Sequence, residues 1–180
     1  MEFVSTDFEG LVIIKPKVFK DERGYFFESF NKNKFIKNAI NIEFVQDNQS
    51  KSDKNVLRGL HFQIPPFTQG KLIQVIKGAV LDVVVDIRKN SKTYAKSFKI
   101  ELSEDNKKML YVPEGFAHGF LTLQNETIFS YKCTNFYNKE SERSLLWNDK
   151  LLNIDWGVNN PILSEKDKLA EPFNSFISPF

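Results

Sequence analysis

Cysteine and histidine are nearly absent from this 180-residue chain. The single cysteine, Cys133, excludes an intramolecular disulfide and indicates a reducing compartment. Because Cys133 falls in an expected strand, we interpret it as a buried structural thiol in preference to a nucleophile. The chain has only two histidines, His61 and His118, and histidine is the usual side chain for proton transfer at neutral pH.

Neither sign of charge dominates, and long apolar runs are missing. The 25 Lys and Arg residues nearly balance the 23 Asp and Glu residues, and a net charge of +2 does not indicate a nucleic-acid partner. No apolar stretch approaches the ~18 residues of a membrane helix. Residues 1–11 lack the basic and apolar regions of a secretory signal. We therefore expect a cytoplasmic protein with no membrane partner.

The alternation of side chains predicts a mainly β fold. With 41% hydrophobic residues, the chain can form one core, and we expect a single domain over residues 1–180. The alternation is strongest over residues 71–88, where one face of the second strand is apolar and the other, with Asp82 and Asp86, is semi-polar. Such a strand is typical of a barrel or sandwich that encloses a polar cavity. Further strands are expected at residues 11–18, 24–29, 44–50, 98–102, 108–112, 119–123 and 127–134.

Only three segments have helical character. Residues 31–40 begin at an asparagine cap, and residues 139–145 could form one or two helical turns. Ser164-Glu165-Lys166-Asp167 has the spacing of a capping box at the start of a short helix. Many short strands and few short helices favour an antiparallel sandwich or barrel over a βαβ fold.

Both histidines lie in segments that glycine and proline restrict, which indicates positioning for chemistry. Pro113-x-Gly115-x-x-His118 resembles the second half of the double motif of the cupins, a family of small β-barrels. Metal-binding cupins have His-x-His and a nearby Glu in the first half, whereas this chain has His61-Phe62-Gln63 and no acidic residue before Asp82. A catalytic metal normally needs three protein ligands. We therefore favour a site without metal; a facial triad and purely structural histidines are the alternatives.

A longer series of motifs resembles one family. The series runs in order from Asp21 to Asp167 and includes Arg58-Gly59-Leu60-His61-x-Gln63, Asp82-Val83-Val84-Val85-Asp86-Ile87-Arg88, Pro113-Glu114-Gly115-Phe116-Ala117-His118-Gly119-Phe120 and Tyr131-Lys132-Cys133-Thr134-x-x-Tyr137. It resembles the dTDP-4-dehydrorhamnose 3,5-epimerases, which are metal-free homodimers with a cupin fold. The resemblance implies an antiparallel β-sandwich or jelly-roll barrel, a homodimer, no cofactor and a dTDP-4-keto-6-deoxysugar substrate.

The implied reaction converts dTDP-4-dehydro-6-deoxy-D-glucose to dTDP-4-dehydro-L-rhamnose. Both C3 and C5 lie next to the C4 carbonyl, so removal of a proton gives an enolate, and reprotonation on the opposite face inverts the centre. By resemblance, the catalytic residues are a base, its carboxylate partner, an acid and a cation at O4: His61, Asp167, Tyr131 and Lys71. Asp82 is the alternative partner of His61, and helix capping is the alternative role of Asp167.

The resemblance also implies residues that bind the nucleotide-sugar. Tyr137 matches an aromatic residue that stacks on thymine, and His118 matches a substrate contact, with a structural role in its turn as the alternative. By resemblance, the diphosphate and sugar contact Arg23, Arg58 and Lys166. Further polar contacts with the nucleotide-sugar, some of them across a dimer interface, are expected from Glu28, Gln46, Asn48 and Glu142. Inversion of C3 alone or C5 alone in a related NDP-4-keto-6-deoxysugar is the alternative function, and a metal-dependent cupin enzyme is a further one.

Overall fold

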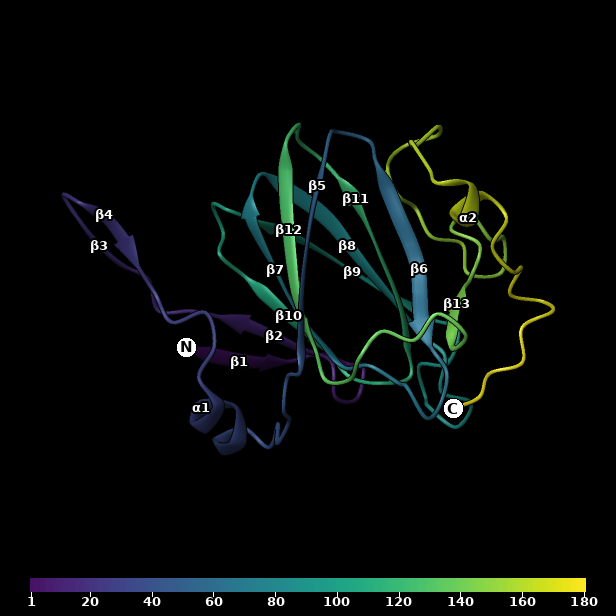
Figure 1. The fold of residues 1–180 in the computed structure, drawn as a ribbon, viewed down its shortest axis with the longest axis horizontal. Helices are drawn as coiled ribbons and strands as arrows, with labels where there is room; N and C mark the ends of the chain where they lie inside the picture. Colours follow the sequence, from purple (N-terminus) through teal and green to yellow (C-terminus); the bar gives the residue numbers. More distant parts are fainter.

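Two antiparallel β-sheets pack face to face in the computed structural model, which describes residues 1–180 (Figure 1). In spatial order, the six-stranded sheet contains β1 (Glu2–Ser5), β2 (Val12–Lys15), β10 (Met109–Val112), β7 (Lys71–Lys77), β12 (Thr127–Cys133) and β5 (Gln46–Ser52). The five-stranded sheet contains β13 (Glu142–Ser144), β6 (Leu57–Gln63), β11 (Phe116–Thr122), β8 (Ala79–Asp86) and β9 (Ser97–Ser103). The predicted antiparallel, mainly β architecture is confirmed.

The expected elements differ from the observed ones at residues 139–145 and at three strands that were not expected, β1, β6 and β3 (Phe19–Asp21). The prediction of a helical turn at residues 139–145 is wrong, because Glu142–Ser144 form β13, in which Ser144 lies opposite His61 of β6. Pairing with a strand about eighty residues away overrides the weak local preference of this segment. The strand β6 itself was not expected, since its glycine and its proximity to prolines are typical of a loop.

The buried apolar residues around β8 form two separate clusters. One fills the interior between the two sheets, and the other covers the outer face of the five-stranded sheet. Val80 and Val84 of β8 pack in the interior cluster against residues of the six-stranded sheet, such as Ile73 and Phe129. The opposite face of β8, with Val83 and Val85, packs beneath the C-terminal segment of residues 145–180. The apolar face of this strand therefore points outward, and the semi-polar face points into the sandwich, where Asp82 is fully buried.

Two glycines allow β6 and β11 to approach each other closely. Gly59 has φ +139°, and a Cβ atom on it would lie 2.4 Å from the Cα atom of Gly119. Residues with side chains rarely adopt this backbone conformation and could not occupy this space. The close approach lies beside the directly paired residues His61 and His118, so the glycines help to bring the two histidines together.

The two helices are short, and both begin at the predicted caps. Helix α1 (Lys32–Lys37) starts after Asn31, whose side chain accepts a hydrogen bond from the Lys34 backbone. Helix α2 (Glu165–Lys168) starts after Ser164 and lies beside β6 (Figure 1). Neither helix has the length and hydrophobicity that crossing a bilayer requires.

A two-stranded arm projects from the body of the molecule (Figure 1). It consists of β3 (Phe19–Asp21) and β4 (Gly24–Phe26), which pair only with each other. Phe19, Tyr25 and Phe26 are each more than half exposed on it. Aromatic side chains concentrated on a projecting arm are typical of a contact surface.

Candidate active site

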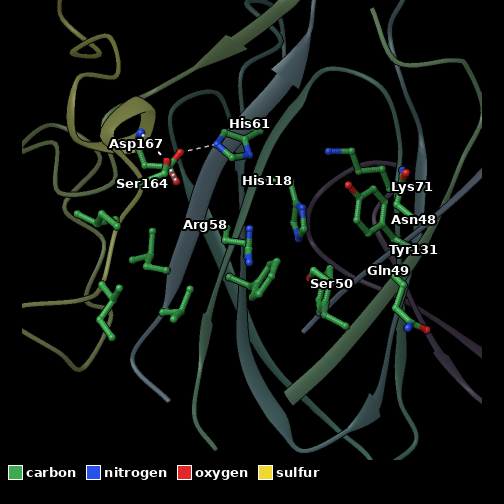
Figure 2. Close-up of a pocket in the computed structure, with 16 residues that line it drawn as sticks. Asn48, Gln49, Ser50, Arg58, His61, Lys71, His118, Tyr131, Ser164 and Asp167 are labelled. Carbon is green, nitrogen blue, oxygen red and sulfur yellow. Dashed lines mark hydrogen bonds and ion pairs between the residues drawn. The ribbon is translucent and has the colours of Figure 1, made fainter. Parts of the chain in front are cut away.

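A cavity of about 490 Å³ lies between the two sheets at the end nearest α2 (Figure 2). Its walls come from both sheets and from the C-terminal segment. The polar side chains that line it are Asn48, Gln49 and Ser50 of β5, Arg58 and His61 of β6, Lys71 of β7, His118 of β11, Tyr131 of β12, and Ser164 and Asp167 at α2. Polar groups converging on a partly apolar pocket are typical of a small-molecule site.

His61 and Asp167 form a dyad on the wall made by β6. The His61 Nε2 atom lies 2.5 Å from Asp167 Oδ1, and Figure 2 shows this contact between the strand and the helix. Asp167 is 2% exposed, whereas the His61 side chain is 29% exposed to the cavity. A carboxylate on Nε2 leaves Nδ1 of the ring as the atom that can take up a proton.

Both oxygens of Asp167 are held, Oδ1 by His61 and Oδ2 by Ser164 at the start of α2. Ser164 caps the helix by accepting a hydrogen bond from the Asp167 backbone, and its hydroxyl donates to Asp167 Oδ2 at 2.8 Å. Burial by itself raises the pKa of Asp167, but the contacts with His61, Ser164 and Lys166 outweigh it and hold this pKa below its usual value. Asp167 therefore belongs to the dyad, and its carboxylate also accepts a hydrogen bond from the capping residue, Ser164.

Tyr131 and Lys71 stand on the opposite wall, which belongs to the six-stranded sheet. The Lys71 Nζ atom lies 5.7 Å from the centre of the Tyr131 ring. Burial raises the pKa of Tyr131 to about 12, so its hydroxyl keeps its proton at neutral pH. Burial also lowers the pKa of Lys71, since its ammonium group is poorly solvated there.

His118 forms a second dyad, with Asp82. The His118 Nε2 atom lies 2.9 Å from Asp82 Oδ2, and both side chains are buried. Burial lowers the pKa of His118, although the neighbouring Asp82 acts in the opposite direction. Asp82, the alternative partner of His61, is therefore engaged by the other histidine, and Asp167 is the carboxylate on His61.

A smaller cavity of about 260 Å³ adjoins the first and shares Asn48, His61, Lys71 and Tyr131 with it. Five predicted nucleotide contacts line it or lie at its edge, where a chain of hydrogen bonds connects Gln46, Asn48, Tyr137, Glu142 and Lys166. Tyr137 donates through its hydroxyl to Glu142 at 3.0 Å and through its backbone to Gln46 at 2.9 Å; Gln46 donates to Asn48 at 3.0 Å, and Lys166 pairs with Glu142 at 2.5 Å.

Arg58 lines the main cavity, but Arg23 and Glu28 do not. Arg58 is held by two hydrogen bonds, of 3.0 and 3.2 Å, to the Ser52 hydroxyl. Arg23 lies on the arm, almost fully exposed, and its only side-chain partner is Asp21. Glu28 follows the arm and pairs with Lys34 and Asn31 of the α1 region. Within one chain, the structure therefore leaves these two predicted residues outside both cavities.

The histidines are not part of a metal-ligand cluster. No group of three or more His, Cys, Asp or Glu side chains is close enough to hold a metal ion. The nitrogen Nε2 of each histidine is engaged by its own carboxylate. Gln63, which stands where metal-binding cupins have a second histidine, instead bonds the backbones of Phe67, Phe136 and Asn138 and so fixes the loop that carries Tyr137.

Some residues of the site were not assigned from the sequence. Ser164 was predicted only as a helix cap. The hydrogen bond from its hydroxyl to the Asp167 carboxylate forms because the first turn of α2 brings the two side chains together. Phe120 and Phe129 stack with ring centroids 4.0 Å apart and form an apolar part of the cavity lining beside His118. The sequence could not reveal this pair because the phenylalanines belong to opposite sheets, among 18 of their kind.

Sequence comparison assigns the chain to a family. A family model described as dTDP-4-dehydrorhamnose 3,5-epimerase matches residues 5–175. The dTDP-4-dehydrorhamnose 3,5-epimerase of Shigella flexneri is 52% identical over 175 residues, which are 96% of this chain and 96% of the relative. The chain belongs to the dTDP-4-dehydrorhamnose 3,5-epimerase family.

Solved structures of this epimerase family share the fold. The dTDP-4-dehydrorhamnose 3,5-epimerase of Elizabethkingia anophelis superposes with a TM-score of 0.91 at 50% identity, covering 97% of both chains. A dTDP-6-deoxy-D-glucose-3,5-epimerase of Legionella pneumophila, solved in complex with dTDP-4-keto-L-rhamnose, gives a TM-score of 0.93 at 44% identity and covers 98% of this chain and 94% of that one. The predicted cupin-like jelly-roll fold of the epimerase family is thereby confirmed.

Proposed function

We propose that the protein inverts C3 and C5 of dTDP-4-dehydro-6-deoxy-D-glucose and so forms dTDP-4-dehydro-L-rhamnose. One observation carries the proposal: a histidine–carboxylate dyad and a protonated tyrosine occupy opposite walls of one cavity. Inversion of a carbon next to a ketone needs a base on one face and an acid on the other. The reaction transfers protons only, so it requires no cofactor, and residues 1–180 act as one functional domain.

The base step falls to His61. With Nε2–H donating to the Asp167 carboxylate, the Nδ1 lone pair takes the proton from C3 or C5, and the electron pair of the broken C–H bond moves to the carbonyl oxygen. Asp167 stabilises the imidazolium that results, because the positively charged ring then faces a negatively charged carboxylate whose two oxygens are held by hydrogen bonds.

Lys71 and Tyr131 complete the cycle from the opposite wall. The Lys71 ammonium faces the developing enolate at O4, where poor solvation strengthens the attraction between the two charges. Tyr131 delivers its hydroxyl proton to the carbon from the face opposite His61, and exchange with solvent then returns a proton to Tyr131 and removes one from His61 before the next inversion. Its raised pKa, about 12, keeps the proton available throughout the physiological range.

The adjoining cavity suits the nucleotide. Lys166 sits next to Asp167 on α2, so a diphosphate bound there is close to the catalytic dyad. Tyr137 is 54% exposed and offers an aromatic face for stacking on the base. The complex of the Legionella relative with dTDP-4-keto-L-rhamnose supports a nucleotide-sugar ligand of the same kind.

We infer that the functional unit is a homodimer in which the arm of each protomer reaches the cavity of the other. The arm leaves aromatic residues exposed and holds Arg23 away from both cavities of its own chain. A cation on a projecting arm is positioned to meet the nucleotide in a second copy. Glu28 directly follows the arm and is therefore close to the same interface.

The epimerase function is tested by NMR of dTDP-4-keto-6-deoxyglucose in deuterated water. We expect deuterium to enter both C3 and C5, and to fail to enter either in His61→Ala. The matched control is Glu165→Gln, an exposed charge change on α2 that contacts neither cavity. Deuterium at one carbon only would establish the mono-epimerase alternative, and absence of exchange would refute the epimerase function. Loss of activity on metal chelation would favour the metal-dependent alternative.

The shared site is tested by mixing two inactive variants, Arg23→Ala and His61→Ala. If the arm acts across the interface, a mixed dimer contains one complete site, formed by His61 of one chain and Arg23 of the other. Random reassociation at equal amounts then restores about a quarter of the sites. If the arm serves its own chain, no mixed dimer has a complete site and activity does not return. The expected cytoplasmic location, with neither nucleic acid nor membrane as partner, stays a prediction.

A further inference from the structure

The two histidine dyads of the cavity have the same hydrogen-bond arrangement. Each ring contacts a buried carboxylate through Nε2, at 2.5 Å for His61 and 2.9 Å for His118. The two histidines lie directly opposite each other on β6 and β11. The His118 Nδ1 atom makes no hydrogen bond within the protein, and the residue lines the cavity (Figure 2).

His118 is the only hydrogen-bond partner of the Asp82 carboxylate, whose charge also acts on the buried Lys71 ammonium. Asp82 is fully buried, its Oδ2 atom meets His118, and its Oδ1 atom has no hydrogen-bond partner. On the same strand, the equally buried Asp86 is bonded to Arg88, Ser91 and Thr93. A half-satisfied buried carboxylate is costly to the fold. Such a cost is typically retained where the group has a functional role.

The contact with Asp82 determines which nitrogen of His118 carries the hydrogen. A carboxylate can only accept, so the neutral ring presents Nε2–H to Asp82 and leaves Nδ1 bare. Burial keeps the ring neutral by lowering the His118 pKa. The phenyl ring of Phe129 lies nearly parallel to the imidazole, with ring centroids 6.1 Å apart and an angle of 16° between the ring planes. A bare, oriented nitrogen in a sugar-sized cavity is an acceptor for a hydroxyl group.

We propose that Asp82 is a positioning residue: it holds His118 in the Nε2–H tautomer so that Nδ1 accepts a hydrogen bond from a hydroxyl group of the bound sugar. The proposal rests on the proposed function only in that the occupant is a nucleotide-sugar. His118 then contributes to substrate specificity by binding a hydroxyl group beside the reacting carbons. It takes no part in proton abstraction, which His61 performs alone.

The tautomer is measured by ¹⁵N NMR of histidine-labelled protein, in which the two histidines give two separate spin systems. We expect His118 to carry hydrogen on Nε2 and none on Nδ1 at neutral pH, and its Nδ1 resonance to move when dTDP-glucose is added but not when dTDP is added. Hydrogen on Nδ1 in the unliganded protein would overturn the proposal. Equal responses to the two ligands would overturn it as well.

Asp82→Asn and Asp82→Leu test the positioning role. The asparagine amide can donate to Nε2 and leucine accepts nothing, so both variants should move hydrogen toward Nδ1. Because a bare acceptor is then lost, binding of dTDP-glucose should weaken about 10-fold, with dTDP binding unchanged. Asp86→Asn is the matched control on the same strand, and we expect it to alter neither the tautomer nor the ratio of the two affinities. A tautomer unchanged in both Asp82 variants would refute the positioning role.

A second pair of variants keeps the test independent of Asp82. Asn at position 118 places its amide near the position of Nδ1, whereas Gln places it near that of Nε2. We therefore expect His118→Asn to bind dTDP-glucose more tightly than His118→Gln, and the reverse order would overturn the proposal. These measurements need no turnover, so an inactive protein with the expected tautomer would refute only the epimerase function, and an active one with the other tautomer would refute only the role of Asp82.

Discussion

Replacing Asp167 by Asn should separate the catalytic role of the dyad from the stability of the fold. The amide is nearly isosteric and can still accept a hydrogen bond from the Ser164 hydroxyl. Its NH₂ group then faces His61 Nε2, which favours the ring tautomer with hydrogen on Nδ1. The base is thus lost from the atom that faces the sugar, and no negative charge remains to stabilise the imidazolium.

The size of the effect follows from the geometry of the pair. At about 4 Å between charge centres and an effective dielectric constant of about 20, an imidazolium and a carboxylate attract by about 4 kcal/mol. Since about 1.4 kcal/mol corresponds to a factor of ten in rate, this attraction is worth about 1,000-fold. The His61 side chain is 29% exposed, and solvent there screens part of the attraction. We expect kcat to fall between about 100-fold and 1,000-fold.

Single-turnover deuterium incorporation at C3 and C5 measures the change directly, with Glu165→Gln as the control for charge loss on α2. The variant should also change the dependence of stability on pH. The Asp167 pKa is lowered in the folded protein, so its carboxylate adds stability above the ordinary pKa of 3.8 that is lost as pH falls through the lowered value. The stability difference between wild type and Asp167→Asn should therefore shrink below about pH 4. If Asp167→Asn retained a rate within about threefold of wild type, or if Glu165→Gln lost as much activity, the conclusion that Asp167 makes His61 an effective base would be refuted.

Three other perturbations give distinct results. Tyr131→Phe should lower the rate about 100-fold or more through loss of the proton donor, and the wild-type rate should not decline through ionisation of Tyr131 until the pH approaches its pKa of about 12, as a pH–rate profile would show. Lys71→Met should be less active but more resistant to thermal unfolding, because burial lowers the Lys71 pKa and its charge therefore opposes folding; an unchanged or lower Tm would contradict this. Asp86→Asn should lose about 2 kcal/mol of stability at pH 7, since its pKa falls from 3.8 to about 2, and urea titrations should show that the loss fades between pH 4 and pH 2; a loss that is constant over this range would refute the assignment.

Local patterns predicted much of the fold because their signals are short-range. The helix caps at Asn31 and Ser164 require only a side-chain oxygen beside the first turn, and both were identified correctly. Alternation over residues 71–88 likewise predicted β7 and β8 as two strands, although it did not show that they belong to different sheets. The prediction for residues 139–145 was wrong, because pairing with a strand distant in the sequence sets their conformation, and local preferences contain no information about that pairing.

The division of β8 into two faces shows the limit of such patterns. The sequence distinguished an apolar face from a semi-polar one, which is the consequence of a side-chain period of two. It could not determine which face lies inside. The C-terminal segment covers the apolar face with residues such as Leu152 and Trp156 from far along the chain, and this leaves the semi-polar face for the interior.

By itself, the sequence determined a protein of antiparallel strands, and its ordered motifs indicated the family and the candidate residues of the site. Only the tertiary structure decided how those residues are arranged. Asp167 pairs with His61 and Asp82 with His118, whereas Arg23 lines neither cavity of its own chain. The physical reason is that hydrogen bonds depend on contacts over a few ångströms between segments more than thirty residues apart in the chain. Composition and spacing carry no information about such distances until the two sheets close on each other.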